Sequence, residues 1–207
     1  MIITIGREFG SGGRELGKRL AEALGIAYFD KEIVAEVAKN TSLAFDYVQN
    51  IIEQRPIVYY PISIGHSFED YNNYVAREYY SVHSEQDKVI KEIASKSDCV
   101  IVGRCADYIL RDLHPYKIFV YSSMEAKIKR CKEKGEVDTS LTDKKIIKSI
   151  KQIDRQRGEY YEFYTGMRWG DKENYDLMIN TSNASIKEIA LGLAEVIRQA
   201  TKKNENK

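Results

Sequence analysis

Apolar positions along the chain follow two alternating patterns, one typical of buried strands and one typical of amphipathic helices. Four short runs of apolar, β-branched or aromatic residues have the length of strands buried on both faces, namely Ile2–Ile5, Val100–Val102, Ile118–Tyr121 and Leu177–Ile179. Between them, apolar residues recur at helical spacing in Gly13–Leu24, Ser84–Lys96, Met124–Lys134, the residues after Thr142 and those after Ser185. Strands that alternate with helices pair in parallel through right-handed crossovers. The pattern therefore predicts an α/β fold, a parallel sheet with helices on both faces.

Two segments and a polar tail interrupt this alternation. Residues 41–80 hold two of the 3 prolines and seven of the 15 tyrosines, so we interpret them as an insertion. Residues 155–174 leave the helical period abruptly and contain three glycines that could act as hinges. The last residues, 201–207, are polar, and we expect them to form a disordered tail. The whole chain, residues 1–207, is expected to form one domain.

Composition and charge narrow the class of protein. The 207 residues carry 32 basic and 31 acidic side chains, so the molecule has no overall field that attracts nucleic acid polymers or anionic membranes. The 3 cysteines lack CxxC spacing, which predicts neither a disulfide framework nor a zinc site and indicates a reducing compartment. No run approaches the ~20 apolar residues that span a bilayer, and the first residues lack a signal-peptide pattern. We therefore expect a cytoplasmic protein.

A glycine-rich loop, GREFGSGG, connects the first predicted strand to the first predicted helix. Such a loop can direct successive backbone N–H groups into one concavity at the positive end of the helix dipole. Glycine allows a phosphate to approach the backbone because it has no Cβ. The predicted anion-binding residues are Gly10, Ser11, Gly12, Gly13, Arg14 and Glu15. The alternative is that the glycines only make a tight strand-to-helix turn.

The loop fits neither of two common nucleotide-binding motifs completely. A dinucleotide-binding GxGxxG loop matches at its first two glycines and at Asp30, ~20 residues later, but Glu15 replaces the third glycine. A phosphoryl-transfer P-loop reads GxxxxGK[ST]. If its second glycine is placed on Gly12, Arg7 occupies the first glycine position and Gly13 the lysine position. The hydroxyl position of the motif, which binds magnesium, then falls on Arg14, immediately before the acidic Glu15.

Further segments occur in an order that distinguishes between these motifs. The chain resembles the cytidylate kinase-like family, a branch of the P-loop nucleoside monophosphate kinases, in ITIGREFGSGGRELGKRLAEALG, YFDKEIV, VIVGRCADYIL, IFVYSSMEAKIKR and YYEFYTGMRWGDKENYDLMINTS. The resemblance covers nearly the whole chain except residues 56–80. It implies a P-loop kinase fold that binds ATP with Mg²⁺ and phosphorylates a small nucleotide, most simply a (d)CMP-type nucleoside monophosphate. It also implies that residues 41–80 form an acceptor-binding helical insertion and residues 155–174 a lid.

The resemblance implies roles for the residues of the glycine loop. Residues 10–15 stand where the loop of ordinary cytidylate kinases reads GSGKGT, and would bind the phosphates of ATP. Loss of the lysine at Gly13 removes a cation that neutralises charge on the transferred phosphoryl group. Arg14, one residue later, would partly replace it as a catalytic cation, although its planar fork differs from an ammonium group.

The resemblance also implies an acceptor site and catalytic arginines. Arg104, Asp30 and Asp107 would bind the acceptor nucleotide, and Arg155 and Arg157 would act on the transferred phosphoryl group when the lid closes. Each residue has a simpler alternative. Arg104 could pair with Asp107 on the following helix, Asp30 could cap a helix, and the two arginines could lie on a solvated helix face.

The sequence leaves open the class of activity, the role of the tyrosines, the magnesium ligand and the oligomeric state. A non-catalytic or regulatory nucleotide-binding protein is the first alternative to a kinase, and an NAD-dependent oxidoreductase is the second. The tyrosines of the insertion could stack on a base or pack in an interface with a partner. No set of side chains has metal-ligand spacing, so the residue that holds Mg²⁺ and the oligomeric state are not assigned.

Overall fold

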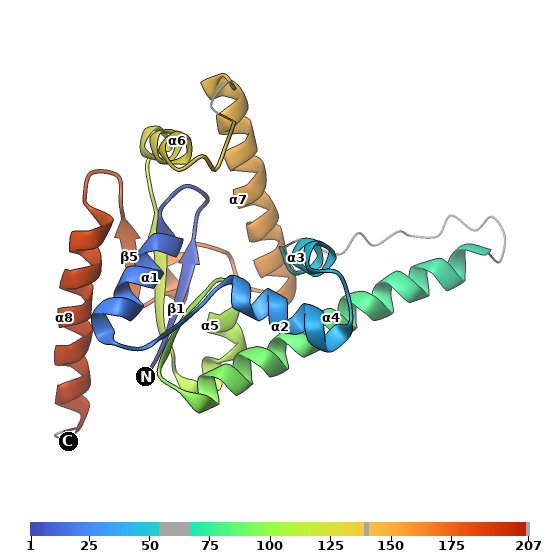
Figure 1. The fold of residues 1–207 in the computed structure, drawn as a ribbon, viewed down its shortest axis with the longest axis horizontal. Coiled ribbons are helices and arrows are strands. Elements are labelled where there is room, and N and C mark those ends of the chain that lie inside the picture. The colour runs from blue at the N-terminus through green and yellow to red at the C-terminus, as the bar shows by residue number, and fades with distance from the viewer. Residues whose placement is uncertain (54–66, 139–140, 206–207) are drawn as a thin grey trace.

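A five-stranded parallel sheet forms the centre of the computed structural model, which describes residues 1–53, 67–138 and 141–205. The strands are β1 (Ile2–Arg7), β2 (Ala27–Phe29), β3 (Cys99–Val102), β4 (Tyr116–Tyr121) and β5 (Leu177–Asn180). Their order is β2-β3-β1-β4-β5, with every neighbouring pair parallel, so β1 is the central strand (Figure 1). The predicted α/β class and parallel sheet are confirmed.

Helices cover both faces of the sheet. They are α1 (Gly13–Leu24), α2 (Lys31–Thr41), α3 (Phe45–Glu53), α4 (Ser67–Lys96), α5 (Ala106–Ile109), α6 (Met124–Glu133), α7 (Asp143–Thr165) and α8 (Ile186–Glu205), with short 3-10 turns at Arg111–Leu113 and Lys172–Asn174. α1 and α8 pack on one face, where Leu20 and Ile197 join the apolar cluster of Ile3 and Ile5. The helices α2, α3 and α4 and the end of α7 form a second cluster on the other face.

The carboxyl ends of the strands meet at one edge of the sheet because all the strands are parallel. In this register Thr4 of β1 lies between Ile101 of β3 and Lys117 of β4. The glycine loop therefore leaves β1 beside the Gly103–Arg104 segment that follows β3. Open α/β sheets bind their ligands at this edge.

Several elements differ from their predicted extent. β2, at Ala27–Phe29, was not predicted, because three residues are too few to establish a strand pattern. The predicted exit from helical structure at Arg155 is wrong, since α7 continues to Thr165. α8 extends to Glu205 and so includes most of the segment expected to be a tail.

Some expectations fall outside the described residues. These are the central part of the insertion, residues 54–66, and the last two residues of the tail, 206–207. The described part of the insertion is helical, because it contains the end of α2, all of α3 and the beginning of α4. Within the described residues, the cysteines Cys99, Cys105 and Cys131 are all free and buried. No helix among these residues has the length and apolar character needed to cross a membrane.

Leu20 tests the packing of α1 and α8 against the sheet. Its side chain is fully buried, and Leu20→Ala is expected to lower the free energy of unfolding by about 2–5 kcal/mol because it leaves a cavity. Leu191, on α8, is 55% exposed and provides a matched control. Leu191→Ala should change stability by less than about 0.5 kcal/mol. Urea denaturation followed by circular dichroism measures both, and equal losses would contradict the packing described here.

Candidate functional site

Two carbonyl groups of the glycine loop between β1 and α1 accept hydrogen bonds from side chains outside the loop. Gly10 and Gly12 adopt φ angles of +70° and +80°, a left-handed region that favours glycine. Arg130 of α6 donates from Nη1 to the carbonyl oxygen of Gly10 at 2.6 Å. The Thr181 hydroxyl, just after β5, donates to the carbonyl oxygen of Ser11, also at 2.6 Å. These contacts hold the loop as an open turn around its N–H groups.

Some N–H groups of the loop are available to a ligand, although the N–H of Ser11 donates to the carbonyl oxygen of Glu8. No hydrogen bond within the described chain uses the backbone N–H of Gly10, Gly12 or Gly13. The first N–H groups of α1 also lack intrahelical acceptors, as in any α-helix. Converging amides at the positive end of a helix dipole favour an anion such as phosphate. The loop thus has the donors required for the predicted anion site.

A buried ion pair network anchors the start of this loop. Lys127 of α6 is only 4% exposed, and its Nζ lies 2.8 Å from Glu8 and 2.9 Å from Asp154 of α7. Asp154 also accepts a 2.6 Å hydrogen bond from the backbone N–H of Phe9. Burial raises the pKa of Asp154 above its usual range, although the N–H of Phe9 and the Lys127 ammonium oppose that shift. No sequence pattern predicted this network, because its members are far apart in the chain.

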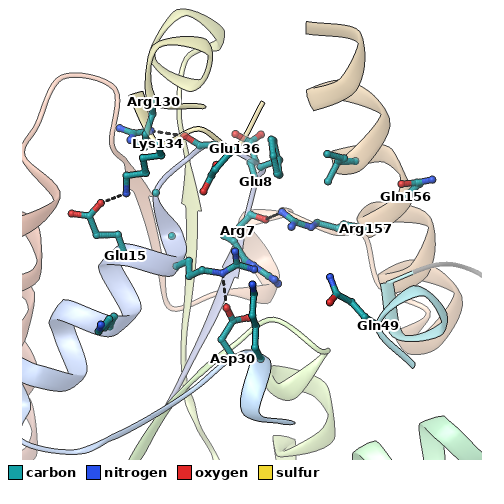
Figure 2. A pocket seen from close by; sticks show the side chains of 18 of the residues that line it. Arg7, Glu8, Glu15, Asp30, Gln49, Arg130, Lys134, Glu136, Gln156 and Arg157 are labelled. Atoms are coloured by element: carbon teal, nitrogen blue, oxygen red, sulfur yellow. Dashed lines mark hydrogen bonds and ion pairs between the residues drawn. The ribbon is translucent and has the colours of Figure 1, made fainter. Parts of the chain in front are cut away.

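A cavity of about 740 Å³ opens in front of the loop (Figure 2). One wall consists of the loop and the first turn of α1. The basic side chains of Arg130 on α6 and Lys134 just after it contribute a second wall, and α7 contributes Gln156 and Arg157. The volume falls within the range of small-molecule and cofactor sites.

Arg14 and Asp30 lie at the floor of this cavity and contact each other. Arg14 Nε is 2.5 Å from Asp30 Oδ2, and Asp30 is almost completely buried. The Arg14 side chain is therefore directed toward the N-terminus of α2. In this conformation it pairs with a predicted acceptor-site residue instead of reaching back along the loop. The backbone N–H of Asp30 is bound by Glu32 in the first turn of α2.

Glu15 lies in the first turn of α1 and is held by two cations. Arg19 donates to one of its carboxylate oxygens at 2.8 Å, and Lys134 pairs with the other. Burial alone would raise the pKa of Glu15, but the hydrogen bonds from Lys134 and Arg19 lower it overall. Glu15 is therefore ionised at neutral pH beside the predicted phosphate site. Elsewhere in the described chain, no three His, Cys, Asp or Glu side chains converge on a possible metal position.

A second, smaller cavity of about 40 Å³ adjoins the first beneath the end of β3. Arg104 lines it and is 5% exposed, in a segment where Gly103, Arg104 and Cys105 all have positive φ. Asp107 also lines it and accepts a 2.6 Å hydrogen bond from the Tyr161 hydroxyl. Burial raises the pKa of Asp107 above its usual value, although the Tyr161 hydrogen bond opposes this.

The two cavities are bridged by a pair of arginines that both of them share. Arg7, at the end of β1, and Arg157, on α7, line both spaces. Arg157 Nη1 donates to the backbone carbonyl of Arg7 at 3.3 Å, and Figure 2 shows the two side chains approaching from opposite walls. The importance of Arg7 was missed in the sequence, where it was noted only as a misfit to the P-loop motif.

The other predicted lid residues are placed differently. The side chain of Arg155 is 78% exposed and pairs with Glu159 one turn later at 2.7 Å, so it lies outside both cavities. Gly158 lies within α7 and faces Trp169. The Trp169 ring in turn packs edge-on against Phe119 of β4. In this conformation the part of the segment around Trp169 packs against β4, and α7 brings only Arg157 of the two predicted catalytic arginines to the site.

Comparisons with known proteins agree with this architecture. A model of the cytidylate kinase-like family matches residues 2–183. A cytidylate kinase from Staphylothermus marinus is 23% identical over 203 residues, which cover 98% of this chain and 99% of the relative.

Solved structures show the same fold. An uncharacterized protein from Eubacterium ventriosum superposes with a TM-score of 0.68 at 28% identity, covering 96% of this chain and 98% of the other. A shikimate kinase from Bacteroides thetaiotaomicron has a TM-score of 0.57 at 13% identity, covering 96% and 98%. At that identity the likeness concerns the fold alone. Together with the sheet order, these matches confirm the predicted P-loop kinase fold.

His83 of α4 tests the aromatic packing behind the second cavity. It is buried against Tyr79 and Tyr160, and burial lowers its pKa from about 6.5 to about 4. Between these pH values His83 is therefore protonated in the unfolded chain and neutral in the folded chain. The free energy of unfolding should fall as pH drops from 6.5 to 4, with a contribution from His83 of up to roughly 3 kcal/mol.

Chemical denaturation of the native protein and of His83→Gln across this pH range measures that contribution. The variant should lose much of the dependence, because glutamine does not titrate. Identical pH profiles for the two proteins would contradict the buried, neutral state of His83.

Proposed function

Because the chain belongs to the cytidylate kinase-like family, we propose that it transfers the γ-phosphoryl group of ATP to a small nucleotide, most simply a (d)CMP-type nucleoside monophosphate. The observation that carries this proposal is the pair of adjoining cavities. One is built on the N–H groups of the glycine loop and the other holds buried Arg104, and Arg7 and Arg157 line both. A phosphoryl donor and a phosphorylated acceptor require two anion sites that meet in this way.

In the proposed reaction an oxygen of the acceptor phosphate attacks the γ-phosphorus of ATP. The bond from that phosphorus to the β–γ bridging oxygen breaks, and ADP leaves. The N–H groups of the loop would hold the donor phosphates. Arg104 would hold the acceptor phosphate through charge-assisted hydrogen bonds. Arg157 would stabilise the negative charge that spreads over the transferred oxygens.

The family implies Mg²⁺, and the carboxylate of Glu15 fits this ion. Mg²⁺ prefers oxygen ligands, and Glu15 is ionised and lines the larger cavity in the first turn of α1. An anion beside a phosphate site is repulsive unless a cation lies between the two. When bound, Mg²⁺ would neutralise charge on the β- and γ-phosphates. Lys134, which pairs with Glu15 in this structure, would then be available to the phosphates.

The insertion and the lid complete the proposal. Residues 41–80 would bind the acceptor, and Gln49 and Asn50 of α3 already face the larger cavity. The segment 155–174 would close over the phosphates and supply Arg157. Asp30 would join the acceptor site once Arg14 turns from it to the donor phosphates as the expected catalytic cation.

A coupled assay of ADP formation tests the proposed function. The panel should include CMP, dCMP, UMP, AMP and GMP, with shikimate as a non-nucleotide acceptor, each with ATP and Mg²⁺. We expect turnover with CMP or dCMP well above the ATPase background. Thermal stabilisation by ATP without turnover on any acceptor would instead support the non-catalytic alternative, and a ligand at ~100 times its Kd adds ~2.7 kcal/mol. Thermal stabilisation by NAD and not by ATP would contradict both the kinase function and the non-catalytic alternative.

Arg104→Ala should weaken acceptor binding selectively. Loss of a charge-assisted contact is worth about 1.5–3 kcal/mol, so the acceptor KM should rise roughly 10- to 100-fold while the ATP KM changes less than about threefold. Arg111→Ala is a matched control, because that exposed arginine stacks on Tyr108 outside both cavities. An equal rise in both KM values would identify Arg104 as a structural residue.

Arg157→Ala should depress kcat far more than it weakens ATP binding. An arginine that stabilises the charge of the transferred phosphoryl group is worth ~10³ or more in rate. Lys151→Ala, an exposed position on the same helix, serves as the control. Arg155→Ala should cause the smaller loss, because its side chain lies outside the cavities. If hydrogen exchange in residues 155–174 does not slow with ATP and acceptor bound, the lid assignment fails.

A further inference from the structure

Two departures from the P-loop motif are reciprocal. When the second glycine of GxxxxGK[ST] is placed on Gly12, the motif expects glycine at position 7 and lysine at position 13. This chain has Arg7 and Gly13 at those positions. The cation is missing from position 13, and a cation is present instead at position 7, the end of β1.

The two positions are in direct contact in the fold. A Cβ placed on Gly13 would lie 2.5 Å from Cβ of Arg7 and 3.1 Å from its Cγ. Real Cβ atoms do not approach other atoms so closely. The φ angle of Gly13 lies outside the left-handed region, so this glycine is required for space and not for its backbone conformation. A lysine at position 13 and the arginine at position 7 therefore exclude each other.

The guanidinium end of Arg7 contacts a second glycine, Gly103. A Cβ on Gly103 would lie 1.7 Å from Nη1 of Arg7, so the guanidinium group rests directly on this turn after β3. Gly103 precedes Arg104, the residue expected to hold the acceptor phosphate. Arg7 thus spans from the phosphate-binding loop at Gly13 to the acceptor side at Gly103, and it is 9% exposed.

We propose that Arg7 is a catalytic residue that supplies, from strand β1, the positive charge that a P-loop lysine supplies from the loop itself. This inference rests on the proposed function, because it places the guanidinium group at the junction of the two phosphates. The planar fork has donors for two oxygens at once, so it can contact the donor γ-phosphate and the acceptor phosphate together. Arg7 is therefore in place before closure, whereas Arg14 would join it only after leaving the ion pair with Asp30.

A cation swap tests this inference. Four proteins are compared: the native chain, Arg7→Gly, Gly13→Lys, and the double variant that carries both changes. Each is assayed for kcat with ATP and the best acceptor, for pyrophosphate affinity by calorimetry, and for thermal unfolding without ligand. Glycine at position 7 removes the Cβ that a side chain at position 13 would meet.

We expect Arg7→Gly to lower kcat by ~10² to 10³ and to weaken pyrophosphate binding at least tenfold. The double variant should regain both to within about tenfold of the native protein. Gly13→Lys alone should unfold at a lower temperature, since its new side chain meets Arg7. Added guanidinium ion should also restore part of the turnover of Arg7→Gly, and this rescue applies even if the double variant does not fold.

Native turnover and pyrophosphate affinity in a folded Arg7→Gly protein would overturn the inference. Failure of both lysine and guanidinium to rescue folded variants would also overturn it, and would identify Arg7 as a structural residue. If the native chain phosphorylates no nucleotide, the proposed function fails separately. Pyrophosphate binding then still decides whether Arg7 is a phosphate ligand. Weaker pyrophosphate binding by Arg7→Gly that is restored in the double variant would support this role of Arg7.

Discussion

The glycine loop depends on one buried ammonium group. Lys127 lies between the carboxylates of Glu8 and Asp154, and thereby ties the loop to both α6 and α7. Burying this ammonium group and partly burying its two carboxylates carries a desolvation cost that opposes their attraction, so the network contributes mainly to a defined geometry. If both carboxylates were removed, the Lys127 ammonium would be left as an uncompensated buried charge. Together with the apolar packing of Phe9 against the cluster that contains Cys131 and Ile150, this network positions Arg130 on α6 and Arg157 on α7 relative to the loop.

A nearly neutral protein can bind multiply charged ligands when its cations are gathered locally. The chain has a net charge of only +1, yet the two cavities collect arginines from strand β1, from the turn after β3 and from α7. The parallel sheet brings these segments together because all its strands end at the same edge. Carboxylates such as Glu15 and Asp30 balance some of this charge within the same space. The site is thus a property of the topology more than of the composition.

Much of the fold could be predicted from local pattern alone. The strand, glycine loop and helix at the start of the chain were identified correctly, because their signals occupy adjacent residues. The extent of α7 was not, because Gly158 and its tyrosine-rich surroundings resemble a loop although Trp169 packs over that glycine. A straight helix also places residues two apart on nearly opposite faces. Arg155 and Arg157 therefore could not both reach one cavity once the helix continued through them.

The candidate site was predicted less completely than the fold. Contacts such as Arg14 with Asp30, Lys127 with Glu8 and Arg130 with Gly10 join residues that are distant in sequence. No spacing rule connects such residues without a structure. Arg104 and Asp107 were predicted because they follow a recognisable strand and resemble a family motif, and both line the smaller cavity. Arg7 was overlooked because it occupies a glycine position of the P-loop motif and therefore counted only as a mismatch. Its contact with Gly13 becomes visible only in the structure.

The contact between Gly13 and Arg7 also constrains how such a loop could have arisen. A chain with side chains at both positions has overlapping atoms, and a chain with glycine at both has a gap and no cation there. A change at position 7 or at position 13 alone is therefore not neutral. If position 13 gains a side chain first, the intermediate protein is less stable, and if position 7 becomes glycine first, it lacks the cation. The two positions are expected to change together in descent. A chain with Arg7 and Gly13 therefore needs two substitutions to acquire the glycine and lysine of the P-loop motif. This steric exclusion is expected to keep the two forms of the loop apart.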